Sequence, residues 1–173
     1  MTSNGDIGTQ PLPQSFVVRW DNVTTDEGEV LYSVKYRRDS LWPWNFHAER
    51  TLHFRNTIVA TIDMSQQWSL QWSRQWKVFD GNKQLLGTVA KKGYGVIDSA
   101  NQYVLQLDPV RGGRLTFWQG PKTWRIRSHS DLSELVYKPH AVYVRLQQKP
   151  TPHQMSMLIT LALEVLDDRS SSD

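Results

Sequence analysis

The chain has 173 residues, a net charge of +3 at pH 7 and no cysteine. A single domain of this length is large enough to bury a hydrophobic core. The lack of cysteine excludes a disulfide framework and every site built on a thiolate, and it fits a reducing compartment. The small positive charge permits an anionic partner but does not require one.

Residues 1–14 are polar and contain two glycines and two prolines, so we expect them to form a flexible N-terminal arm. They hold no apolar run of the kind that secretory signals carry, so we expect an intracellular protein, either cytoplasmic or peripheral at a membrane. We also expect a monomer. The folded domain is expected to span residues 15–168, with a polar tail at 169–173.

Alternation of polar and apolar side chains, the pattern of half-buried strands, recurs along most of the chain. We expect strands at residues 16–20, 29–38, 50–54, 57–62, 75–79, 84–89, 103–107, 115–118, 124–127 and 142–147. Asp80-Gly81 is a strong hairpin signal, whereas Pro43, within residues 41–46, should interrupt the sheet. Roughly twelve strands at intervals of about ten residues predict a sandwich or a barrel.

The strongest single element is the run at residues 155–166, which is apolar on every side. A helix of that kind must be surrounded by protein or lipid. At ~1.5 Å per residue it is ~18 Å long, too short to span a bilayer. We therefore predict a core helix at residues 153–166, which Asp167, Asp168 and Arg169 should end. Closing the sheet removes its edges and leaves a lumen for this helix. The predicted fold is mainly β: a closed antiparallel barrel of roughly twelve strands around a buried C-terminal helix.

Three segments carry a resemblance to a known family: Trp-Lys-Val-Phe-Asp-Gly at 76–81, the return strand at 85–89, and the apolar helix with its acidic end at 159–168. This combination is similar to the tubby C-terminal-like superfamily, closest to its LURP-one-related and scramblase-like branch. The resemblance covers residues 16–168. It implies a closed β-barrel threaded by its C-terminal helix.

The resemblance also implies a binding function. Tubby proteins bind phosphoinositide headgroups through a Lys-x-Arg pair on a strand, which Lys35-Tyr36-Arg37 matches here, in a basic run that stops at Arg38. Two cations on one strand face can clamp a phosphate, with arginine adding bidentate bonds. The implied protein is non-catalytic, needs no cofactor, and binds acidic phospholipid at a membrane surface or a protein partner. The implied anion ligands are Lys35, Arg37 and Arg38. The scramblase-like route to the membrane, a palmitoylated cysteine cluster, is absent.

Aromatic residues suggest an alternative. Trp68, Trp72 and Trp76 recur every four residues and form a row, which either packs in the core or lines a pocket for an apolar ligand. Trp42 and Trp44 could cover that pocket or insert at a membrane interface. With a buried acid or histidine, such a pocket would suit a small positioning enzyme, an isomerase or cyclase of a hydrophobic substrate, for example in specialised metabolite biosynthesis. A third reading is an interaction domain with neither lipid nor substrate.

Other chemistry finds little support in the sequence. It contains no phosphate loop, dinucleotide fingerprint or G-x-S-x-G motif, and no nucleic-acid module, so no nucleic-acid partner and no metal site are predicted. The basic strand at 124–127, with Lys122 and Arg114 nearby, is either an anion-binding patch or an ordinary solvated strand face.

Overall fold

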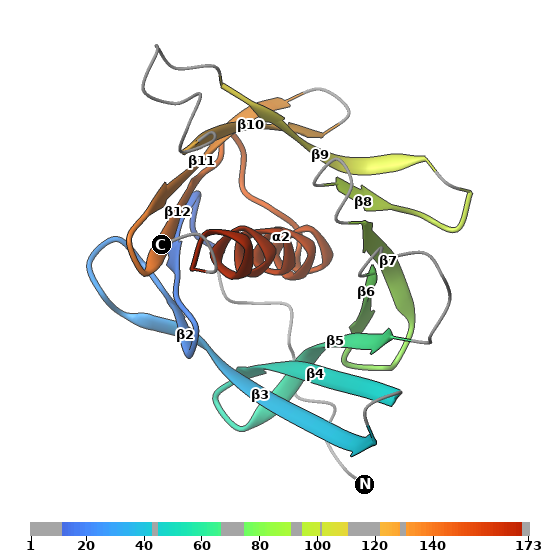
Figure 1. Cartoon of the computed structure of the whole chain (residues 1–173). Coiled ribbons are helices and arrows are strands. Elements are labelled where there is room, and N and C mark those ends of the chain that lie inside the picture. The colour runs from blue at the N-terminus through green and yellow to red at the C-terminus, as the bar shows by residue number, and fades with distance from the viewer. Residues whose placement is uncertain are drawn as a thin grey trace, which may run out of the picture.

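The computed structural model describes residues 12–42, 45–66, 75–90, 95–100, 102–110, 122–128 and 131–170. These residues form twelve strands and one helix (Figure 1). The strands are β1 (Ser15–Val18), β2 (Asn22–Thr24), β3 (Val30–Trp42), β4 (Asn45–Phe54), β5 (Thr57–Gln66), β6 (Gln75–Asp80), β7 (Leu85–Ala90), β8 (Gly95–Ile97), β9 (Tyr103–Pro109), β10 (Thr123–Ser128), β11 (Asp131–Lys138) and β12 (Ala141–Arg145). Each strand pairs with its neighbour in sequence, and β1 pairs antiparallel with β12, so the barrel is closed. The predicted closed antiparallel barrel is confirmed.

Helix α2 (Pro152–Ser170) occupies the centre of the ring of strands (Figure 1). Every residue from 155 to 166 is buried, which explains why the run is apolar on all sides. The barrel wall contributes inward side chains such as Phe16, Leu52, Ile62 and Leu135, all at most 1 % exposed. Each large apolar side chain of α2 buried in this way stabilises the fold by roughly 2 kcal/mol. The predicted core helix is therefore confirmed, and its side chains form the centre of the hydrophobic core of the barrel.

The start of α2 is fixed by a reciprocal cap. The backbone N–H of Gln154 donates to the Thr151 hydroxyl at 3.2 Å, and the N–H of Thr151 donates to the Gln154 side-chain oxygen at 2.9 Å. This is a capping box, and Pro152 in the first turn needs no hydrogen-bond acceptor for its nitrogen. The helix thus begins at Pro152, before the apolar run does.

The predicted end of the helix is wrong. Asp167, Asp168 and Arg169 do not stop α2, which continues to Ser170. The reason is tertiary: Asp167 forms an ion pair with Arg50 of β4, and Arg169 lies over the ring of Trp124 at 5.6 Å. Polar residues at the end of an apolar run remain helical when the barrel wall supplies partners for them.

The predicted hairpin around Asp80-Gly81 is confirmed, because β6 pairs with β7. The Asp80 carboxylate accepts hydrogen bonds from the backbone N–H groups of Asn82 at 2.9 Å and Gln84 at 2.8 Å. A Cβ added at Gly81 would lie 2.9 Å from the carbonyl oxygen of Ile58, so this position requires glycine. The turn therefore packs directly against the start of β5.

Three strands were not predicted: β2, β8 and β11. The longest, β11, pairs with both β10 and β12 and so is an integral part of the wall. Its inward positions include Ser133, a polar residue that interrupts the apolar alternation and hides the strand. Strands β3 and β4 are also longer than expected and include residues 41–42 and 45–46, within the stretch where a break is predicted. Residues 43–44 lie outside the described residues, as does the strand predicted at 115–118.

The expected N-terminal arm lies mostly outside the described residues. Its last part, residues 12–14, runs beside the barrel: the backbone N–H of Leu146 donates to the Gln14 carbonyl at 2.7 Å, and Leu12 packs against the core.

Candidate functional site

Strand β3 carries the cations that the sequence proposes as anion ligands. Lys35, Arg37 and Arg38 are all exposed. Side chains alternate along a strand, and Val34, which is 7 % exposed, points inward, so Lys35 and Arg37 lie together on the outer face. Arg38 is in register with the fully buried Ala48 and lies on the opposite face. The structure thus brings together two of the three predicted ligands.

The neighbours of this pair across the sheet differ in charge. Arg37 is in register with Glu49, Glu49 with Asp63, and Asp63 with Lys77, which gives a balanced row of two cations and two anions. His47 adds to it by contacting Asp63 at 2.9 Å. Arg37 therefore faces a carboxylate directly across the strand pair, where opposite charges attract.

Lys35 lies in a row that carries no acid. It is in register with Thr51, which is in register with Thr61. The Thr51 hydroxyl lies 2.9 Å from Nε2 of His53. Burial lowers the pKa of His53, and the nearby Lys35 ammonium lowers this pKa further. The place best suited to an anion is therefore centred on Lys35, Thr51 and His53, with Arg37 at its edge.

The predicted aromatic candidates contribute little to a described site. Trp44, Trp68 and Trp72 lie outside the described residues; Trp42 ends the backbone of β3, but its side chain also lies outside them. Trp76, the last member of the predicted row, is 3 % exposed and belongs to the core. Whether the remainder of the row faces a pocket stays a prediction.

A cluster around the buried Arg50, which the sequence analysis did not predict, joins the barrel wall to the C-terminal end of α2. The Arg50 side chain is 8 % exposed, and its Nη2 donates to both carboxylate oxygens of Asp167, at 2.9 and 2.8 Å. The guanidinium also lies over three aromatic rings, those of Trp76 at 4.9 Å, Tyr36 at 5.5 Å and Trp20 at 5.7 Å. We call this group the Arg50 clasp. Its ion pair and cation–π contacts compensate a buried charge, so its role is structural.

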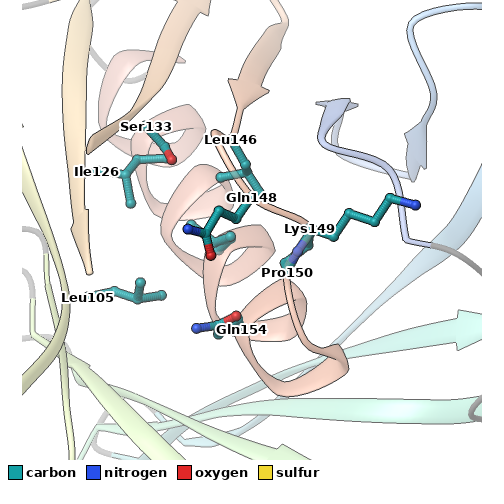
Figure 2. Close-up of a pocket in the computed structure, with 9 residues that line it drawn as sticks. Leu105, Ile126, Ser133, Leu146, Gln148, Lys149, Pro150 and Gln154 are labelled. Atoms are coloured by element: carbon teal, nitrogen blue, oxygen red, sulfur yellow. The ribbon is translucent and has the colours of Figure 1, made fainter. Parts of the chain in front are cut away.

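A small crevice opens beside the N-terminal half of α2 (Figure 2). Its floor is apolar, with Leu105, Ile126 and Leu158, and Gln148 and Gln154 add amide groups. The side chain of Lys149 extends away from it (Figure 2). Its volume of about 60 Å³ is far below the roughly 300–1,000 Å³ of small-molecule sites, so it is not a substrate chamber.

Other classes of site find no support within the described ranges. There, no three His, Asp or Glu side chains gather as a metal ion would require. In that part of the chain no helix combines the length and apolarity needed to cross a bilayer. Comparisons with family models, curated proteins and solved structures give no match to this chain. The resemblance to the tubby-like superfamily therefore stays a prediction.

Proposed function

We propose that this domain is a non-catalytic module that binds acidic phospholipid headgroups through the outer face of β3 and β4. The observation that carries the proposal is the position of Lys35 and Arg37, exposed on one outer face beside Thr51 and His53. The Lys35 ammonium would attract a headgroup phosphate as a point charge, and the Arg37 guanidinium can add bidentate hydrogen bonds. When Nε2 of His53 carries its proton and donates to Thr51, the Thr51 hydroxyl is a further donor for the same phosphate.

Glu49 sets the expected strength of this interaction. A carboxylate in register with Arg37 reduces the net charge that a headgroup meets, so the binding should be moderate and strongly weakened by salt. The affinity should also increase with the number of phosphates on the headgroup. Each phosphate adds attraction to Lys35, and the row that Lys35 forms with Thr51 and Thr61 contains no acid to repel it.

The alternative, a positioning enzyme for a hydrophobic substrate, is supported less well. It needs a buried acid beside an open chamber. Glu164 of α2 is a buried acid, at 4 % exposed. However, α2 itself fills the lumen, and the crevice described beside the helix holds only about 60 Å³.

The proposal is tested by liposome co-sedimentation with neutral vesicles, with phosphatidylserine vesicles and with vesicles that contain a phosphoinositide, each at two salt concentrations. We expect binding only to the anionic vesicles and weaker binding at the higher salt. Each basic residue near such a surface is worth about 1 kcal/mol, so Lys35→Ala with Arg37→Ala should weaken binding roughly 30-fold.

The matched control is Lys122→Ala with Lys138→Ala, which removes the same charge from exposed positions elsewhere on the barrel. If both double variants lose binding equally, the attraction is a property of net charge and not of the β3 face. If neither wild type nor control binds any vesicle, the lipid proposal fails, and a protein partner becomes the leading alternative.

A further inference from the structure

A hollow of about 390 Å³ opens at β10, β11 and β12, away from β3, and its lining includes Arg125, Glu134 and Arg145. It is more open to solvent than enclosed. Strand register runs Arg125, Glu134 and Arg145 across it as direct neighbours on three adjacent strands. All three are exposed and alternate with the buried Trp124, Leu135 and Val144, so they point outward. The hollow therefore presents a row of charges ordered positive, negative, positive.

These charges are not engaged elsewhere in the described part of the chain. Asp108 is in register with Arg125, but its carboxylate forms an ion pair with Arg127 at 2.6 Å. Arg125, Glu134 and Arg145 make no salt bridge with a described side chain. Two guanidinium groups and one carboxylate leave the row with a net charge of +1, which favours an anion.

The carboxylate of Glu134, between the two arginines, determines which kind of anion fits the row. Strands lie about 4.8 Å apart, so the two arginines start about 10 Å from each other with Glu134 between them. A purely anionic ligand that bridged them would meet the Glu134 carboxylate and be repelled. A ligand with an ammonium group between two carboxylates matches all three side chains, and carboxylates suit the bidentate geometry of arginine.

From this arrangement we propose that the hollow is a binding site for an acidic amino acid, with one carboxylate on Arg125, one on Arg145 and the ammonium on Glu134. The proposal is independent of lipid binding, because it uses none of the side chains on β3 and β4.

The test is isothermal titration of the purified protein with L-glutamate and with two analogues that each lack one matching group. Glutarate lacks the ammonium, and L-glutamine lacks the second carboxylate. An exposed pair contributes up to about 1 kcal/mol, so we expect each analogue to bind about fivefold more weakly than L-glutamate. Arg125→Gln and Arg145→Gln should each weaken L-glutamate binding by a similar factor.

Glu134→Gln gives the sharpest readout, because it should reverse the order of ligands: glutarate should then bind at least as tightly as L-glutamate. Arg127→Gln, which removes an arginine already paired with Asp108, is the matched control and should change neither affinity by more than about twofold. Circular dichroism confirms that each variant is folded. The absence of saturable L-glutamate binding, an unchanged ligand order in Glu134→Gln, or an equal loss in Arg127→Gln would overturn the proposal.

Discussion

The Arg50 clasp allows a quantitative test of what holds the end of α2 against the barrel. Replacing Asp167 with alanine leaves the Arg50 guanidinium, 8 % exposed, without its carboxylate. Breaking a buried ion pair from one side costs about 3–5 kcal/mol. Because the Asp167 side chain is 23 % exposed and the three rings still surround the cation, we expect a loss just below this range, about 2.5 kcal/mol.

The two partners are then separated by a double-mutant cycle. Arg50→Met removes the buried charge but keeps most of the volume, so we expect a loss of about 2 kcal/mol, from the lost ion pair and the lost ring contacts. Once one partner is absent, removing the other should cost little. The double variant should therefore lose about 3 kcal/mol, which gives a coupling energy of about 1.5 kcal/mol.

The assay is urea unfolding followed by circular dichroism, which avoids the fluorescence of the tryptophans around Arg50. The exposed ion pair of Arg127 and Asp108, with side chains 64 % and 32 % exposed, provides the control cycle. Its coupling should not exceed about 0.5 kcal/mol, because solvent screens exposed charges. A coupling for Arg50 and Asp167 as small as that of the exposed pair would refute the claim that the clasp anchors the helix.

Three further outcomes follow from burial and close contacts. Leu161, fully buried in α2, should not tolerate aspartate: Leu161→Asp should abolish cooperative unfolding by circular dichroism, whereas Leu161→Met should cost less than about 1.5 kcal/mol. Gly81→Ala should lower stability by about 1–3 kcal/mol, because its Cβ would press on the Ile58 carbonyl, and an unchanged urea midpoint would contradict this. Lys35→Met should raise the pKa of His53, measured by NMR titration. Folding lowers this pKa from 6.5, so the stability that neutral His53 contributes is lost as the pH falls below about 6.5. The variant should lose less stability than the wild type over the same pH range.

The sequence predicts the architecture well because two hydrophobicity patterns, one of the strands and one of the helix, determine it. Polar and apolar residues alternate along the long strands, and the run at 155–166 lacks any polar face, so a shell with a buried helix is the arrangement that satisfies both. Prediction from periodicity fails where a polar residue occupies an inward position of a strand. Ser133 hides β11, and in the inward series Ala48, Arg50, Leu52 a charged residue stands at a core position. That anomaly is the one sequence signal that could have indicated the clasp.

The candidate sites depend on strand register, which periodicity does not supply. Alternation alone places Lys35 and Arg37 on one face. That Glu49 lies opposite Arg37, and that Glu134 separates Arg125 from Arg145, follows only from knowing which residues are paired. The pairing within the Arg50 clasp is even harder to predict from the sequence, because Arg50 and Asp167 are 117 positions apart.

The position of α2 after all the described strands has a consequence for how the protein is made. A barrel whose lumen is filled by a later segment has no complete core while that segment is still inside the ribosome. The inward faces of the earlier strands would then be exposed until residue 166 has emerged, and pairing of β1 with β12 must also wait for the last strand. Such non-local closure is slow and leaves strand edges open to association. Nascent chains of this protein should therefore depend on chaperones until α2 has left the ribosome.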